Sequence, residues 1–343
     1  MSASSAQPEP RIAIVLVNWN GWRECIECID SVLAQIHGNF HIFVVDNDSR
    51  DLSIEKIASW CSAPAADPGW RRQSGVDRHS DAADALVVPH RIMDHVGASV
   101  ASPKGTLVTL IRAGGNLGFA GGCNVGIKAA GLDDFAYFWF LNPDTVVERR
   151  ALAELVARAA HSPTAGIIGS TLLFYDAPGT VFALAGGRLN LQNGHGSHVG
   201  QGTCASLLVD APRVERELTW VCGASMFVSR AFVREVGLMQ EDYFLYYEEA
   251  DWATRGARKF RLGFAPKSVV FHKSGANSSK IMPLFTAGFY YRNRLRFMGR
   301  FYPDRVAATR RRLFREMLGH VARRRWAWAR LVGTTLLWKI PGD

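Results

Sequence analysis

The chain has 343 residues, of which 48% are hydrophobic, and its 40 lysines and arginines exceed its 31 acidic residues to give a formal net charge of +9. This composition can bury the core of one large domain or of two, and it excludes an intrinsically disordered chain. No apolar run reaches the roughly eighteen residues that a membrane-spanning helix requires. The polar residues 1–10 lack the apolar core of a secretory signal, so we expect a short disordered tail there. The scattered cysteines then predict reduced thiols in a cytosolic protein.

The N-terminal part of the chain predicts the beginning of a doubly wound parallel sheet. Residues 12–17 (IAIVLV) form a continuous apolar strand, the turn NWNG follows, and residues 22–36 have helical periodicity. Residues 41–47 (HIFVVDN) predict a second strand and residues 53–61 a second helix. This alternation of strands and helices is typical of α/β folds with a parallel sheet.

A cysteine pair with the spacing Cys25-x-x-Cys28 lies in the first predicted helix. Such a pair can bind zinc or act as a redox centre, but no second Cys or His pair has the spacing of a zinc site. Cys25 shares the i, i+4, i+7 spacing of one helical face with Ile29 and Val32. This spacing favours packing in the core.

Beyond residue 61 the sequence predicts an inserted segment, the rest of the sheet and a basic C-terminal region. Residues 62–104 show no clear period, and we expect an inserted loop. Strand and helix patterns then resume and continue to residue 280. In residues 281–343 the character changes, because thirteen arginines between positions 290 and 330 face only two acids, Asp304 and Glu316. Apolar and aromatic residues alternate with these arginines, which predicts a basic amphipathic helical extension.

Polar side chains follow three of the apolar runs. Asp46 ends one run, Asn142-Pro143-Asp144 ends the run FWFL, and His272 closes VVFH. The carboxyl ends of parallel strands meet at one edge of a sheet, where ligands bind. Asp46 there can accept hydrogen bonds from a nucleobase or a ribose, whereas the Asn-Pro-Asp motif and the His272 imidazole suit a divalent cation. Each group also has a local alternative, since Asp46 could form an Asx turn or a helix cap and Asn-Pro-Asp makes an ordinary turn.

The glycine-rich segment 114–126 (GGNLGFAGGCNVG) joins a predicted strand to a predicted helix. Glycines let the backbone approach a ligand closely, and NH groups at a helix start attract phosphate. The spacing is neither that of the dinucleotide fingerprint G-x-G-x-x-G nor that of a P-loop, which disfavours a dehydrogenase and a P-loop NTPase. Asn116 and Asn124 are candidate ligand contacts in this segment, and a purely structural turn is the alternative.

Three carboxylates, those of Glu248, Glu249 and Asp251, gather in the segment YFLYYEEADW. Acids crowded beside aromatic residues repel one another, so at least one of them should have a raised pKa. Such a carboxylate suits a general base that takes a proton from a hydroxyl. The same acids would also suit a helix N-terminus, where they interact favourably with the helix dipole.

Seven motifs follow one another along the chain: IVLVNWNG, VVDNDSRD, GGNLGFAGGCNVG, FLNPDTVV, VCGASMFVSR, FLYYEEADWATR and VVFHKSG. Their order resembles that of the family-2 inverting glycosyltransferases, and most closely that of the rhamnosyltransferase-like branch. The resemblance covers roughly residues 11–279. It implies a GT-A fold, an α/β/α sandwich around a mostly parallel sheet, for residues 11–280.

The resemblance implies a nucleotide pocket formed by the first strand ends and the glycine-rich segment. Asn18 and Asp46 would lie in this pocket, with Asp46 near the base. Asn116 and Gly118 would border the nucleotide and its sugar.

The resemblance also implies a site for Mg²⁺ or Mn²⁺. Asn142-Pro143-Asp144 stands in place of the Asp-x-Asp motif of the family. Asp144 would bind the metal directly, and Asn142 would be a neutral substitute for the first acid. His272 would complete the binding of metal and diphosphate.

For the general base, the acid cluster resembles the Glu-Asp motif of the family, which a third acid follows. Glu248 matches the glutamate, Glu249 stands where aspartate is usual, and Asp251 is the third acid. The resemblance implies Glu249 as the base, one methylene longer than expected, with Glu248 or Asp251 as the alternative.

The function that the resemblance implies is metal-dependent inverting transfer of a sugar to a hydroxyl of a polysaccharide or a lipid-linked glycan. We expect dTDP-rhamnose as the donor; a UDP-linked hexose or galactofuranose is the alternative, and a catalytically silent binding module is a second one. The basic extension could pack on the catalytic domain or lie on an anionic membrane surface, and we expect it to bind no nucleic acid. The expected location is cytoplasmic, with peripheral attachment to the inner face of the cell membrane.

Overall fold

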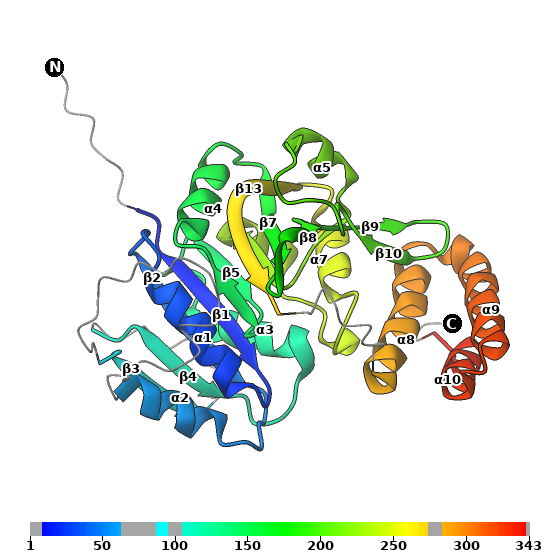
Figure 1. Ribbon diagram of the computed structural model, residues 1–343, viewed down its shortest axis with the longest axis horizontal. Coiled ribbons are helices and arrows are strands. Elements are labelled where there is room, and N and C mark those ends of the chain that lie inside the picture. Colours follow the sequence, from blue (N-terminus) through cyan, green and yellow to red (C-terminus); the bar gives the residue numbers. More distant parts are fainter. Residues whose placement is uncertain (1–8, 63–86, 95–104, 274–282, 341–343) are drawn as a thin grey trace.

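Figure 1 shows the computed structural model, which describes residues 9–62, 87–94, 105–273 and 283–340. A mixed ten-stranded sheet forms the centre, in the order β3-β4-β2-β1-β5-β12-β7-β13-β6, with β8 paired to β7. Its strands are β1 (Ile12–Asn18), β2 (Phe40–Asp46), β3 (His90–Asp94), β4 (Val108–Arg112), β5 (Tyr137–Leu141), β6 (Thr145–Val147), β7 (Ala165–Phe174), β8 (Ala177–Leu184), β12 (Ser225–Ser229) and β13 (Arg261–His272). The pairs among β3, β4, β2, β1 and β5 are all parallel, whereas β12 runs antiparallel to both of its neighbours. The predicted α/β fold with a mostly parallel sheet is confirmed.

Helices cover both faces of the sheet because alternate residues of each strand point to opposite sides. The covering helices are α1 (Trp22–Leu33), α2 (Ser53–Ser62), α3 (Gly118–Ala130), α4 (Ala151–Ala160), α6 (Arg230–Val236) and α7 (Glu248–Gly256). Ile12 and Ile14 of β1 belong to the core that α1, α2 and α4 complete. Ala13 and Val15 belong to the core on the other face, with α3, α6 and α7. The result is the three-layered sandwich seen in Figure 1.

The cysteine pair of α1 is part of the first of these cores. Cys25 and Cys28 are both fully buried, and Cys28 Sγ lies 3.5 Å from Thr145 Oγ1. Burial raises the pKa of the Cys28 thiol to about 12, so the thiol is protonated and unreactive at neutral pH. The prediction that this pair packs in the core is confirmed.

A small second sheet and a C-terminal helical group lie beside the sandwich (Figure 1). The small sheet contains β9 (Gly186–Asn190), β10 (His195–His198) and β11 (Trp220–Val221), and α5 (Ala211–Glu217) precedes β11. The C-terminal group contains α8 (Leu284–Phe301), α9 (Val306–Ala322) and α10 (Trp326–Leu336). The three helices share a core of their own, and Phe297 and Met298 of α8 also pack against Tyr243 and Tyr247. The predicted helical extension is therefore joined to the sandwich through α8.

Some predicted boundaries differ from the structure. The segment predicted as an inserted loop contains β3, an edge strand that pairs parallel to β4. The helix predicted to reach residue 36 ends at Leu33. The tail predicted at residues 1–10 lies mostly outside the described residues. In the part of the chain that the structure describes, no helix has the length and hydropathy needed to cross a bilayer.

Candidate active site

The ends of β1 and β2 place two of the predicted nucleotide-pocket residues side by side. Asn18 and Asp46 are partners in the parallel register, and Asn18 Nδ2 donates to Asp46 Oδ1 over 3.0 Å. The second carboxylate oxygen of Asp46 accepts from the backbone N–H of Ser49, three residues on, over 3.1 Å, so Asp46 also holds the turn that follows β2. Asn18 Oδ1 and Asn47 Oδ1 are buried and have no hydrogen-bond partner among the described residues. These two acceptors are available to a ligand at this strand edge.

The glycine-rich segment mainly serves close packing. Gly118 has φ +71°, and a Cβ there would lie 2.3 Å from the carbonyl oxygen of Phe244. Cβ atoms at Gly122 and Gly126 would lie 2.4 Å from side chains of β1. The exposed Asn116 accepts a hydrogen bond from Gly118 N–H over 3.1 Å. These contacts agree with a structural turn, and they fix Gly118 against the turn that precedes α7. The contact of Asn116 and Gly118 with a nucleotide stays a prediction.

Asn124, a candidate ligand contact in the sequence, has a structural role instead. Its side chain is buried, donates to Met239 O over 2.9 Å and to Glu241 Oε1 over 2.8 Å, and accepts from Met239 N–H over 3.0 Å. An amide that is satisfied in this way ties α3 to the segment before α7 and has little capacity left for a ligand.

The Asn-Pro-Asp motif and His272 meet where β5 and β13 end. His272 Nε2 lies 3.3 Å from Asp144 Oδ1. Burial alone would raise the pKa of Asp144. The hydrogen bond and charge of His272, a backbone hydrogen bond and the charge of Lys273 together outweigh it, so the pKa lies below its ordinary value. His272 Nδ1 is buried without a partner among the described residues. An ionised carboxylate beside an imidazole fits a divalent cation, although no group of three or more His, Cys, Asp or Glu side chains gathers around such a site in the described parts of the chain.

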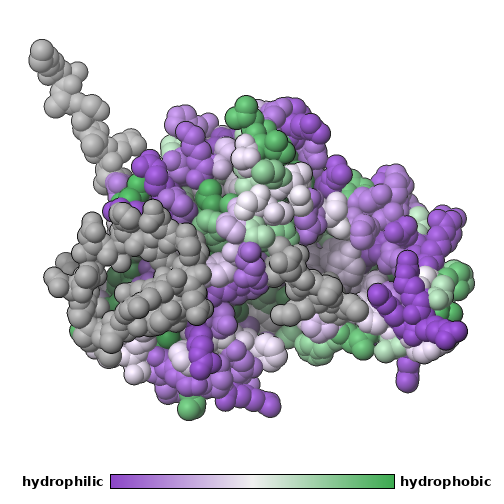
Figure 2. Space-filling model, viewed as in Figure 1, coloured by the Kyte–Doolittle hydropathy of each residue, from purple (hydrophilic) through white to green (hydrophobic). Residues whose placement is uncertain are grey.

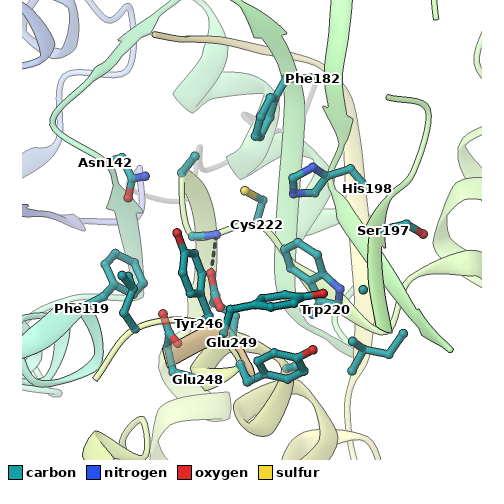
Figure 3. Close-up of a pocket in the computed structure, with 18 of the residues that line it drawn as sticks. Phe119, Asn142, Phe182, Ser197, His198, Trp220, Cys222, Tyr246, Glu248 and Glu249 are labelled. Carbon is teal, nitrogen blue, oxygen red and sulfur yellow. Dashed lines mark hydrogen bonds between the residues drawn. The ribbon is translucent and has the colours of Figure 1, made fainter. Parts of the chain in front are cut away.

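Glu248 and Glu249 open α7, after a turn in which Phe244, Tyr246 and Tyr247 have φ values of 60°, 69° and 73°. Glu249 Oε1 accepts a hydrogen bond from Gly223 N–H over 3.2 Å (Figure 3, dashed line). Burial raises the pKa of Glu249 to about 7, against the lowering effect of its backbone hydrogen bonds. Burial, and then the charge of Glu249, raise the pKa of Glu248 well above its ordinary value. Burial therefore favours the neutral form of Glu248, while Glu249 is partly ionised at neutral pH.

Asp251, the third acid of the cluster, lies apart from the other two. Its fully buried carboxylate accepts from Tyr243 OH over 3.1 Å and from Arg255 Nε over 2.6 Å, and it pairs with Arg300 over 3.1 Å. It does not line the pocket that contains Glu248 and Glu249. Asp251 therefore has a structural role, because its carboxylate joins α7 to Arg300 of α8.

A pocket of about 570 Å³ brings together four of the predicted site residues, Asn142, Glu248, Glu249 and His272. In Figure 3, Asn142 and Phe119 lie on one side and His198 and Trp220 on the other, with Tyr246 and Glu249 between them. Asn18, Asp46, Asn116, Gly118 and Asp144 are not among its lining residues. The site thus consists of this pocket and of the neighbouring strand edge.

Sequence reasoning missed Asn293, which holds the turn before the acid pair. Asn293 is 2% exposed on α8, and its Nδ2 donates to the carbonyl oxygens of Tyr243, Leu245 and Tyr246 over 2.6, 2.8 and 3.0 Å. These bonds span 47 to 50 residues. The only signal in the sequence is an asparagine within a helix rich in arginine and aromatic residues, which does not identify a distant partner.

The mixed sheet, the polar groups at its strand ends and the acid pair above them define the architecture of a GT-A glycosyltransferase. Residues 13–72 and 96–210 match the sequence model of Glycosyl transferase family 2. This match covers more than half of the chain, and the chain belongs to glycosyl transferase family 2. The family predicted from the order of the motifs is confirmed, and with it the transfer of a sugar from a nucleotide-linked donor.

Three known proteins are similar over most of the chain. The low-salt glycan biosynthesis hexosyltransferase Agl10 of Haloferax volcanii is 22% identical over 298 residues, which cover 82% of this chain and 74% of that protein. The structure of the mannosyltransferase PcManGT from Pyrobaculum calidifontis, in complex with GDP-Man and Mn²⁺, matches with a TM-score of 0.50 and 14% identity over 96% of this chain and 88% of that one. The structure of S. aureus TarS 1-349 matches with a TM-score of 0.49 and 11% identity over 84% of this chain. The match spans 64% of that TarS chain, less than two thirds of it.

Proposed function

We propose that this glycosyltransferase carries out inverting transfer of a sugar to a hydroxyl of a polysaccharide or lipid-linked glycan, with Glu249 as the general base. The observation that carries this proposal is the position of Glu249, which Gly223 N–H holds in the same pocket as Asn142 and His272. A carboxylate whose pKa is about 7 is both partly ionised and sufficiently basic at neutral pH.

In the proposed reaction the acceptor hydroxyl gives its proton to Glu249 while its oxygen bonds to the anomeric carbon of the donor sugar. The bond to the nucleoside diphosphate breaks on the opposite face, so the anomeric centre inverts. The sugar passes through an oxocarbenium-like transition state, as in glycoside hydrolysis. Burial and then the charge of Glu249 favour the neutral form of Glu248, which limits the negative charge beside the base.

Asp144 and His272 are the proposed ligands of a Mg²⁺ or Mn²⁺ ion. The lowered pKa of Asp144 keeps this carboxylate ionised at neutral pH, and Mn²⁺ tolerates an imidazole ligand better than Mg²⁺ does. When bound, the cation supplies charge stabilisation for the departing diphosphate.

We propose dTDP-rhamnose as the donor, with a UDP-linked hexose or galactofuranose as the alternative. The support for rhamnose is the order of the seven motifs. The solved structures of relatives contain other donors, namely GDP-Man in PcManGT and UDP-GlcNAc in TarS. The contact between His272 and Asp144 and the hydrogen bond that holds Glu249 support an enzyme over the silent binding module.

The test is the thermal unfolding of the purified protein with dTDP, UDP or GDP, each with and without Mn²⁺. A ligand at about a hundred times its Kd adds roughly 2.7 kcal/mol to the free energy of unfolding. We expect a metal-dependent rise in Tm with one nucleotide that disappears in Asp144→Asn. A chain that responds to no nucleotide would contradict the proposed function and favour the binding module.

We also propose that the C-terminal helices lie on an anionic membrane surface, where a lipid-linked acceptor would be found. Large apolar side chains of this region are 48% to 85% exposed, namely Phe285, Phe314, Leu318, Trp326 and Leu337. Figure 2 shows hydrophilic and hydrophobic residues side by side over these helices, at the right of the molecule. Arginine near an anionic surface gains about 1 kcal/mol per residue. Flotation with vesicles containing phosphatidylglycerol should carry the protein upward, whereas pure phosphatidylcholine vesicles should not; equal behaviour with both would refute the proposal.

A further inference from the structure

The pocket around Glu249 has an unusual charge balance for a chain so rich in arginine. Among the described residues that line it there is no lysine and no arginine, although the chain has 40 of them. The nearby arginines of α8 are already paired, Arg294 with Glu316 and Arg300 with Asp251. The acids in the lining are Glu248 and Glu249.

The two histidines of the lining do not replace the missing cations. Burial, and then the charge of His272, lower the pKa of His198 to about 4, so His198 is neutral at pH 7. His272 is directed to Asp144 at the sheet edge. The cation proposed at Asp144 and His272 would be occupied by the diphosphate of the donor. An acidic group of the acceptor that entered the pocket would be desolvated beside a partly ionised Glu249, with no cationic side chain among the described lining residues, which is costly.

Aromatic rings form the walls of the pocket instead. Trp220 comes from β11, Tyr246 from the turn before α7 and Tyr290 from α8. The Tyr246 and Tyr290 rings meet edge to face with centroids 6.1 Å apart, and the Trp220 ring lies 5.2 Å from that of His198. Trp220 packs against Gly187, where a Cβ would lie 2.4 Å from the indole. Three separate elements thus hold these rings in fixed positions beside Glu249.

Such walls match the chemistry of a neutral sugar. One face of a pyranose carries mostly C–H bonds and packs against an aromatic ring, while its hydroxyls remain free for polar groups at the rim. We infer that the pocket binds the acceptor as an uncharged sugar residue, stacked on Tyr246 or Trp220, with one hydroxyl at Glu249. Any phosphate or acidic group of the acceptor lies outside the pocket. This inference rests on the proposed function, and it names the class of the acceptor.

The test uses saturation-transfer NMR with simple glycosides as probes, in the presence of Mg²⁺ and of the nucleotide that raises Tm. The neutral probes are methyl glucoside, methyl N-acetylglucosaminide and methyl rhamnoside, and the anionic ones are methyl glucuronide and glucose 6-phosphate. We expect at least one neutral probe to bind at millimolar concentration, at least tenfold more tightly than every anionic probe. Equal or tighter binding of an anionic probe, or no binding of any neutral probe, would overturn the inference.

Variants of Tyr246 test whether the neutral probe binds in this pocket. Tyr246→Ala removes the ring and should weaken the neutral probe about threefold to tenfold, whereas the matched control Tyr246→Phe keeps the ring and should bind as the wild type does. Trp220→Ala is the second variant, in case the turn does not tolerate the first change. Unchanged probe binding in both alanine variants contradicts the inference. The nucleotide-dependent rise in Tm, measured on the same samples, reports separately on the proposed function.

Discussion

At the scale of single residues, Glu249 is the side chain on which the proposed chemistry depends. Glu249→Gln keeps the shape and the contact with Gly223 but removes the proton acceptor. We expect a loss of transfer of about 10²- to 10⁴-fold, with nucleotide binding unchanged, because a positioned general base contributes that much. The rate of product release at saturating donor measures the loss of transfer. The nucleotide-dependent rise in Tm measures nucleotide binding. Wild-type turnover in this variant would exclude Glu249 as the base.

The raised pKa of Glu249 predicts the pH dependence of the reaction. The base must be ionised to accept a proton, and burial favours the neutral form up to about pH 7. The value of kcat/KM should therefore rise with pH, change tenfold per pH unit well below 7, and level off above it. A pH series at constant ionic strength measures the profile. Activity that falls as the pH rises through 7 would show that the protonated carboxyl is the active form.

Asp251 should behave differently from Glu249, although only one residue separates them. Asp251→Ala leaves Arg255 and Arg300 without their buried partner. Because both arginines are partly exposed to water, we expect a loss of roughly 2 kcal/mol rather than the full cost of breaking a buried pair. Urea unfolding measures this loss, with Glu249→Gln as the control, whose stability should stay near that of the wild type. A fully stable Asp251→Ala variant would contradict the structural role.

The sequence identified the acids but could not distinguish their roles. Two positions along an α-helix turn the side chain by about 200°, so that Glu249 and Asp251 face opposite sides of α7. Which side faces the pocket depends on the packing of α8, which no local pattern shows. Asn124 was misread for a similar reason, since the partners that satisfy its amide are 115 and 117 residues away.

At the scale of elements, the turn from Tyr243 to Tyr247 is held by α8. Asn293→Asp replaces the donating NH₂ with an oxygen that repels the three carbonyls, so the turn and the acid pair should shift. We expect kcat to fall by at least tenfold while nucleotide binding is retained. Arg292→Ala, on the exposed side of the same helix, is the matched control and should act as the wild type does. If both variants have the same kcat as the wild type, Asn293 does not position the acid pair.

The predictability of the elements follows the strength of their apolar pattern. Strands β1, β2 and β5 are buried on both faces of the sheet, and their continuous apolar runs were sufficient to predict them. Strand β3 has no fully buried residue and a single neighbour in the sheet. Its sequence, HRIMD, has neither an apolar run nor a regular alternation, so the local pattern predicts a loop.

At the scale of the whole molecule, α8 makes the C-terminal helices part of the catalytic domain. Removing residues 283–343 would delete Asn293, Arg294 and Arg300, and with them the contacts to the turn, to Asn193 and to Asp251. We expect the truncated chain to unfold at lower urea concentration and to have no transfer activity, and the full chain to unfold in one transition. A truncated chain with wild-type stability would show that the helices are an independent domain.

Asn293 lies 47 to 50 residues after the turn that it holds, and this separation affects how the chain folds during its synthesis. A ribosome produces the sheet strands and the acid pair well before residue 293, and contacts between distant residues form late in folding. Until α8 leaves the ribosome, the turn lacks the three hydrogen bonds from Asn293, and the acid pair is held only by its contacts within the sandwich, such as the hydrogen bond from Gly223 N–H to Glu249. We therefore expect the nascent chain to pass through a stage in which its N-terminal strands are folded before Asn293 fixes the turn beside the acid pair.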